Sequence, residues 1–197
     1  MQQFIRSRQS VRRFLPEPVP AEALQRILET ATWAPSAHNR QPWRFVVLTG
    51  EASRTRLADA MGDDFRRDLL ADNLPHEQVE AQVERSRQRI IEAPAAILLC
   101  LDSAEMDTYP DERRQQAEYL MAVQGVAMAG QNLLLAAHAE GLGAVWMCAP
   151  LFAPETGRCA LALPDTWEPQ GLVLLGYPAK ISPARPRRKL DELIKSL

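Results

Sequence analysis

The chain has 197 residues, of which 46% are hydrophobic and 24% charged, and its formal net charge is −2. This length suffices for one domain with a full core, and the near-zero charge excludes nucleic acid or a membrane surface as a partner bound by the chain as a whole. The three cysteines lack metal-ligand and redox-motif spacing, which favours reduced thiols in the cytoplasm. The N-terminal residues also lack the apolar stretch of a signal peptide, and we expect a single domain over residues 1–197.

The chain begins with a predicted short helix at residues 2–7, followed by an extended segment at 8–14. In an extended segment Arg8, Ser10 and Arg12 point to the same side, because side chains alternate. Two guanidinium groups and a hydroxyl on one face suit a phosphate. The alternative is a solvated basic stretch near the terminus.

A proline-rich connector at 15–20 leads into a predicted amphipathic helix at 21–33, and an unusually polar loop follows at 33–44. Pro35 and Pro42 restrict the loop backbone, and we expect Trp33 and Trp43 to form apolar walls. Between them lie the hydrogen-bonding side chains of Ser36, His38, Asn39, Arg40 and Gln41. A polar loop held on a rigid platform is typical of a ligand site.

The next segments alternate between strand and helix patterns. We expect a strand at 43–49, a helix at 51–61 and a strongly charged helical flap at 62–92 that is interrupted at 73–75. The flap is either a mobile lid over a ligand or a solvated helical hairpin that only packs. An interior strand at 95–101 contains Cys100, which we interpret as a core thiol. The loop at 102–110 contains Asp102, Glu105 and Asp107, but it lacks the spacing of a calcium loop.

Residues 111–140 have the pattern of one long helix. Because residues 119–139 are apolar on nearly every side, we expect this helix to be buried on every face. Its polar interruptions argue against a membrane span, and its small residues permit close approach within the chain or across a dimer axis. His138 is expected to hydrogen-bond near the helix end, and Gly141 to end the helix.

The remainder of the chain predicts two strands, at 143–148 and 170–178, separated by a helix at 155–161 and a turn at 163–169. A basic tail at 185–189 and a short helix at 190–196 follow. No nucleophile motif, phosphate-binding loop or dinucleotide fingerprint is present, and no acid is marked as partner for His38. Two basic clusters and a polar loop favour a planar, phosphorylated ligand, and a bound cofactor could supply the chemistry.

Taken in order, Arg8-x-Ser10-x-Arg12-x-Phe14 and Ala34-Pro35-Ser36-x-x-Asn39-x-Gln41-Pro42-Trp43 resemble the nitroreductase family of flavin enzymes. Gly141-Leu142-Gly143, Gly176-Tyr177-Pro178 and the basic tail fit the same pattern. The resemblance implies an α+β fold: an α/β/α sandwich with a central mixed, mainly antiparallel sheet around a long buried helix. It also implies an intertwined homodimer with FMN at the subunit interface and C-terminal segments that extend over the partner.

The resemblance further implies roles for individual residues. Arg8, Gln9, Ser10 and Arg12 would hold the FMN phosphate and ribityl chain, and Arg187, Arg188 and Lys189 would complete the phosphate site. Pro35, Ser36, Ala37 and Asn39 would contact the flavin of the other subunit, while Cys148 and Ala149 would lie at the N5 edge of the flavin. His38 and Arg40 would face the second substrate. Many members have Glu-Gly where this chain has Cys148 and Ala149.

A narrower similarity is to the flavin-reductase domain fused to the glutamate ligase of deazaflavin-coenzyme biosynthesis. It rests on Trp33–Trp43, on residues 147–152 and on the charged flap. We therefore expect an FMN-dependent oxidoreductase that takes a hydride from a reduced nicotinamide or similar donor. The acceptor would be a nitro compound, a quinone or a dehydro precursor of a deazaflavin coenzyme. The alternatives are a nonenzymatic binder of a phosphorylated ligand or deazaflavin, and an enzyme that fragments FMN to dimethylbenzimidazole.

Overall fold

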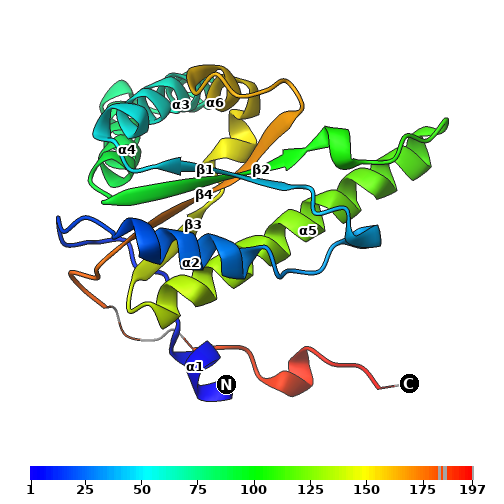
Figure 1. Ribbon diagram of the computed structural model, residues 1–197. Helices are drawn as coiled ribbons and strands as arrows, with labels where there is room; N and C mark the ends of the chain where they lie inside the picture. Colours follow the sequence, from blue (N-terminus) through cyan, green and yellow to red (C-terminus); the bar gives the residue numbers. More distant parts are fainter. Residues whose placement is uncertain (182, 184–185, 197) are drawn as a thin grey trace.

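The computed structural model describes residues 1–181, 183 and 186–196, and it arranges them in three layers (Figure 1). A four-stranded sheet lies between one helical layer formed by α2 (Ala21–Ala31) and α5 (Glu112–Ala139) and another formed by α3 (Glu51–Ala71), α4 (His76–Ile91) and α6 (Pro154–Ala160). A short α1 (Gln2–Ser7) begins the chain. The predicted α/β/α architecture is confirmed.

The sheet contains β1 (Trp43–Leu48), β2 (Ala95–Asp102), β4 (Trp167–Gly176) and β3 (Gly143–Met147), in that spatial order. All three strand pairs are antiparallel, and the parallel pairing among the described residues is an isolated bridge between Ser10 and Ala144. The strand β2 is buried along its whole length, as its uninterrupted apolar run predicts. Its alternate residues face the two helical layers: Ile97 packs on the α5 side and Leu98 on the α3 side.

The turn predicted at 163–169 is wrong in its second half, because β4 begins at Trp167. Pro169 lies inside the strand, opposite Cys100, where the register of β2 and β4 shifts. A proline cannot donate to the ladder, but a bulge is a place where a strand tolerates one. The composition of this segment therefore indicated a turn where the tertiary pairing produces a strand.

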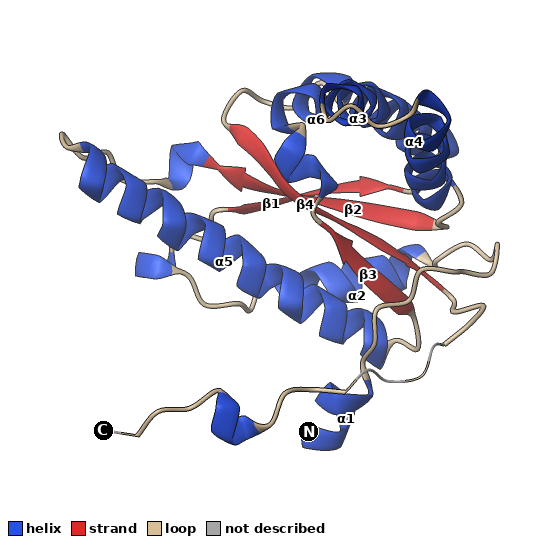
Figure 2. Ribbon diagram, turned by 180° about the vertical axis from the view of Figure 1, so that it is seen from behind, coloured by secondary structure: helices blue, strands red, loops and turns tan. Residues whose placement is uncertain are grey.

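The helix α5 runs along the sheet (Figure 2), and the prediction that it is buried on every face is wrong for a single chain. Leu120 is 50% exposed and Met128 is 39% exposed, whereas Val126 and Leu133 are fully buried. Its length and composition would also allow a membrane span. The helix nevertheless packs its buried side against α2 and the sheet, as a core helix does.

The expected boundary near residue 61 is also wrong, because α3 continues without a break to Ala71. The chain turns only at Asn73, which has a positive φ of 58°, and Pro75 precedes α4. The charged flap is therefore the second half of α3 together with α4. Ion pairs between Arg66 and Glu80 and between Arg87 and Asp59 join the two helices, and Val79, Val83 and Ile90 of α4 are buried.

Candidate functional site

The N-terminal segment predicted to bind a phosphate is fixed to the edge of the sheet at β3. The Val11 amide donates to the carbonyl of Ala144 (3.0 Å), and the Val11 side chain lies directly on Gly143. A Cβ at Gly143 would come within 2.7 Å of the Val11 side chain, so this approach requires glycine. The contact holds residues 8–12 extended, with Ser10, Arg12 and Arg13 exposed.

A small cavity of ≈ 160 Å³ lies beside this segment. Arg8 and Gln9 line it together with His138 and the residues that follow α5. His138 Nε2 lies 2.8 Å from the Ser7 hydroxyl, which confirms the expected hydrogen bond near the helix end. The helix ends at Ala139, and the left-handed Gly141 (φ 75°) turns the chain, with the amides of Gly141 and Leu142 donating to the carbonyls of His138 and Ala137.

Arg8 and Arg12 of this segment carry a permanent positive charge. Neither Arg8 nor Arg12 takes part in an ion pair among the described residues. Unpaired guanidinium groups next to a cavity attract an anion and can bind phosphate oxygens in bidentate fashion.

The C-terminal segment starts beside the same N-terminal residues. The Leu15 amide donates to the Tyr177 carbonyl (2.8 Å) and the Ala179 amide to the Arg13 carbonyl (3.0 Å), and Ile181 lines the small cavity. Residues 187–189 follow in an exposed stretch. Arg185, which the sequence placed in the same basic tail, lies outside the described residues.

The polar loop between α2 and β1 has a constrained backbone. His38, Asn39 and Gln41 have φ values of 51°, 53° and 51°, which non-glycine residues rarely adopt. The Ser36 hydroxyl accepts a hydrogen bond from the Gln41 amide (3.0 Å) and so closes a one-turn helix, η1 (Ala37–Asn39). Strained backbone of this kind persists where the surrounding structure holds it, and it is often found at ligand sites.

The loop rests on the middle of α5. A Cβ added at Gly125 would lie 3.4 Å from Cβ of Ser36 and 3.5 Å from Cγ of Pro42. The Pro42 carbonyl accepts a bond from the Asp102 amide (2.8 Å), which ties the end of the loop to β2. Of the two predicted aromatic walls, Trp33 is 85% exposed, but Trp43 is buried as the first residue of β1. Trp43 is therefore a core residue, because β1 starts there.

The acidic residues of the 102–110 loop are ion-pair partners of this polar loop. Arg40 pairs with Asp107, and Arg44 pairs with Asp102 (2.9 Å) and Glu105 (2.5 Å). The side chain of Asp102 is 9% exposed, and it also accepts from the indole nitrogen of Trp167 (3.2 Å). No cluster that could hold a metal occurs in the described part of the chain. No local pattern indicated these pairings, because they join segments about 60 residues apart.

Cys148 and Ala149 follow the end of β3, where Trp146 locks the strand in place. The Trp146 ring fits against two glycines: an added Cβ would lie 2.3 Å from it at Gly130 of α5 and 2.2 Å from it at Gly171 of β4. Cys148 is exposed, and Ala149 begins the one-turn helix η3 (Ala149–Phe152). In contrast, burial raises the pKa of the Cys100 thiol to about 12, as its predicted role in the core requires.

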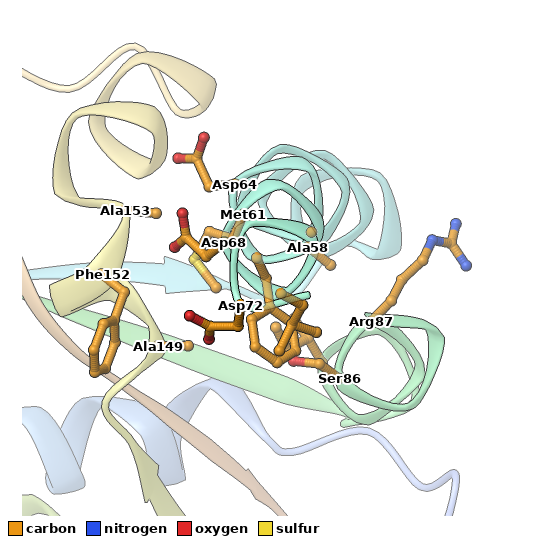
Figure 3. A pocket seen from close by; sticks show the side chains of 14 residues that line it. Ala58, Met61, Asp64, Asp68, Asp72, Ser86, Arg87, Ala149, Phe152 and Ala153 are labelled. Atoms are coloured by element: carbon orange, nitrogen blue, oxygen red, sulfur yellow. The ribbon is translucent and has the colours of Figure 1, made fainter. Parts of the chain in front are cut away.

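A larger cavity of ≈ 370 Å³ adjoins Ala149, between η3 and the helices α3 and α4 (Figure 3). Its walls combine apolar side chains with the carboxylates of Asp64, Asp68 and Asp72. These residues were not identified as site residues from the sequence. Their spacing of four residues, which places them on one face of a helix, was the signal that could have found them.

Within one chain, the polar loop and the N-terminal segment lie at different points along α5. The loop contacts Gly125, whereas Val11 contacts Gly143, just beyond the end of the helix at Ala139. At 1.5 Å per residue, the part of α5 between these contacts spans about 20 Å. A single chain therefore presents the two groups of predicted site residues separately.

Comparisons with known proteins agree on one family. The model of the nitroreductase family matches residues 5–177. A Methanothermobacter thermautotrophicus protein named as an NADH dehydrogenase or NAD(P)H nitroreductase is 32% identical over 178 residues, which cover 89% of this chain and 76% of that protein. The 5,6-dimethylbenzimidazole synthase of Rhodospirillum rubrum is 32% identical over 185 residues, which cover 89% of this chain and 81% of the synthase.

Among solved structures, a nitroreductase from Desulfovibrio desulfuricans in complex with FMN is 31% identical, with a TM-score of 0.75. The match covers 100% of this chain and 95% of that one. The fold, the sequence identity and the length of the matches all indicate the same class of protein. The predicted class, a flavoprotein oxidoreductase, is therefore confirmed. The chain belongs to the nitroreductase family.

Proposed function

We propose that the chain is an FMN-dependent oxidoreductase that works by two half-reactions in one pocket. When bound, FMN supplies two-electron chemistry, taking a hydride from a donor such as a reduced nicotinamide and passing the electrons to an acceptor. The observation that carries the proposal is Arg8, which lines a cavity at the edge of the sheet and, like Arg12 of the same segment, forms no ion pair among the described residues.

The residues of the N-terminal segment fit a phosphorylated cofactor. Arg8, Ser10 and Arg12 offer donors, neither arginine is in an ion pair within the part of the chain that the structure describes, and Gln9 lines the adjoining cavity. Arg187, Arg188 and Lys189 would add positive charge from the C-terminal segment, which starts next to residues 13–15. In this proposal the chain binds the phosphate and ribityl chain of FMN and thereby orients the flavin.

The flavin ring would lie against the residues after β3 and the polar loop of a second subunit. Cys148 and Ala149 would approach its N5 edge from one chain, and Pro35, Ser36, Ala37 and Asn39 would contact it from the partner. The separation of about 20 Å along α5 supports a site shared between two chains. The exposed apolar side chains of Leu120 and Met128 on α5 also favour a homodimer.

His38 and Arg40 are proposed to face the second substrate. This substrate would be a nitro compound, a quinone or a dehydro precursor of a deazaflavin coenzyme. Arg40 already pairs with Asp107, so an anionic acceptor would have to compete with that carboxylate. We further propose that residues 1–197 form a single domain. We also propose a cytoplasmic location, which agrees with the three unbridged cysteines.

Purification tests the cofactor directly. The protein should bind FMN with a yellow flavin spectrum that survives gel filtration, and a reduced nicotinamide should bleach this spectrum in stopped-flow mixing. Arg8→Ala with Arg12→Ala should lose FMN. His38→Ala with Arg40→Ala should retain FMN and slow the reoxidation by acceptor. A protein that takes up no FMN from excess would refute the proposal, and flavin binding without turnover by any donor would favour a nonenzymatic binder.

A second candidate function is the fragmentation of FMN to 5,6-dimethylbenzimidazole. The synthase of Rhodospirillum rubrum is as similar to this chain, at 32% identity, as the relative from Methanothermobacter thermautotrophicus. Incubating the protein with reduced FMN and oxygen and analysing the products by mass spectrometry would separate the two functions. Dimethylbenzimidazole is expected only if flavin is the substrate.

A further inference from the structure

We propose that the cavity between α3, α4 and η3 is the binding pocket for the organic part of the second substrate and that it selects aromatic cations over anions. The proposal rests on the proposed flavin site, because Ala149 connects the two. The cavity volume of ≈ 370 Å³ lies within the range of pockets for small organic ligands.

The walls are suited to a flat apolar body. Met61, Phe65 and Leu69 of α3 line the cavity on one side, Ile90 of α4 lines another, and Phe152 of η3 closes a third. Phe152 is 79% exposed although it is a large aromatic residue. Figure 3 shows its ring beside the cavity, across from Asp68 of α3 and from Asp72, which directly follows the helix. An aromatic ring in this place can contact a planar ligand and attract a cation over its face.

The charge of the walls is negative. Asp64, Asp68 and Asp72 all line the cavity, whereas Arg87, the cationic residue in its lining, is bonded to Asp59 at 2.6 Å and points away from the cavity in Figure 3. Asp64 is neutralised by Arg67 (2.6 Å). Asp68 has only a distant guanidinium (4.0 Å), and the Asp72 carboxylate has no partner among the described residues.

This arrangement works against the stability of α3. Like charges four residues apart repel one another on a helix, and carboxylates in the last turn face the negative end of the helix dipole. Asp68 and Asp72 stand at that end, since α3 finishes at Ala71. Their negative field is therefore available to a ligand, and it complements a positively charged one.

The test compares two redox-inert probes of similar shape, benzyltrimethylammonium and phenylacetate, by calorimetry on the FMN-loaded protein. The cation should bind at least tenfold more tightly than the anion. Asp68→Asn with Asp72→Asn should weaken cation binding roughly tenfold and reduce its dependence on salt, because two nearby charges are removed. Phe152→Ala should also weaken it, since the variant loses one wall and the ring face.

Asp63→Asn is the matched control. Asp63 lies on the same helix, is 79% exposed and pairs with Arg66 outside the cavity, so its removal should leave cation binding unchanged. Equal affinities for the two probes, or the same loss in the control as in the double variant, would overturn the inference. Flavin content measured by absorbance reports separately on the proposed function, because the probes bind without turnover.

The same charge preference should appear in catalysis. With (4-nitrobenzyl)trimethylammonium and 4-nitrobenzoate as acceptors, kcat/KM should favour the cation, and the preference should fall about tenfold in the Asp68→Asn, Asp72→Asn variant. Each turnover uses one nicotinamide hydride and one proton to convert the nitro group to a nitroso group and water. An unchanged preference in the double variant would overturn the assignment of the cavity to the second substrate.

Discussion

The two helical layers cover opposite faces of one sheet, but they differ in how closely they pack. On the α5 side, Gly125 and Gly130 allow the polar loop and the Trp146 ring to contact the helix backbone closely. On the α3 side, the helices and η3 leave a cavity of ≈ 370 Å³. The first layer supports the polar loop that is proposed to contact the flavin, and the second leaves a cavity that adjoins Ala149.

The charges differ in the same way. The arginines of the polar loop, Arg40 and Arg44, are both neutralised by carboxylates of the 102–110 loop. On the other side of the sheet, Asp68 and Asp72 face the cavity without a close counter-charge among the described residues. A charged residue is available to a ligand where the fold leaves it unpaired.

The largest expected effect tests the close packing of the α5 layer. Gly130→Ala should destabilise the protein by about 1–3 kcal/mol, because its Cβ would overlap a Trp146 ring that Gly171 confines from the other side. The free energy of unfolding from urea denaturation measures this change.

Gly62→Ala in α3 is the matched control. Its new Cβ would lie 3.5 Å from the Val83 side chain, an ordinary contact, so the higher helix propensity of alanine should stabilise the protein by about 0.5–1 kcal/mol. Equal effects of the two substitutions would show that the two layers do not differ in packing.

Arg44→Met tests the half-buried ion pairs under the polar loop. The variant leaves Asp102, whose side chain is 9% exposed, without its counter-charge, and we expect a loss of about 1–3 kcal/mol in the free energy of unfolding. Arg66→Met removes a more exposed arginine from pairs with Asp63 and Glu80 and should cost less than about 1 kcal/mol. A loss in the control as large as in Arg44→Met would contradict this contrast.

Thr156→Val tests the link between α6 and the acidic face of α3 and should make stability less sensitive to acid. The pKa of Asp64 lies below its ordinary value. The hydrogen bond from the Thr156 hydroxyl is the largest cause, and Arg67 lowers this pKa further. This stabilisation is present above the unfolded pKa of about 3.9 and is lost as pH falls through the lower folded pKa.

The Thr156→Val variant should therefore unfold about 1 kcal/mol more easily at pH 7 and should approach the parent protein near pH 2, as urea titrations at both pH values would show. Thr30→Val removes a hydroxyl that donates to the Arg26 carbonyl, and its effect should not depend on pH. A constant difference between Thr156→Val and the parent would mean that Asp64 is not the group concerned.

The smallest effect is expected for the exposed pair in the polar loop. The side chains of Arg40 and Asp107 are 45% and 38% exposed, so Arg40→Ala should change the free energy of unfolding by less than about 1 kcal/mol. Any such change should shrink in high salt, as thermal melts at two salt concentrations would reveal. A larger loss would indicate that Arg40 mainly holds the loop in place.

The succession of helices and strands could be read from the sequence, since the apolar run of β2 and the amphipathic spacing of α2 are local patterns. The predictions were wrong where contacts with residues distant in the sequence overrode a local pattern. Trp43 looked like a wall of the site but is covered by the core, and Pro169 looked like part of a turn but lies at a bulge of β4. The single-chain exposure of Leu120 likewise follows from where α5 lies on the sheet.

By itself, the sequence determined the family, the order of the elements and the motifs proposed to bind FMN, because periodicity, proline and glycine act over a few residues. Only the tertiary structure decided which charges are neutralised and which remain free. Arg40 and Asp107 are 67 positions apart, and Asp72 comes near η3 only when α3 packs on the sheet. Such pairings depend on distances across the fold, and no local spacing in the sequence encodes them.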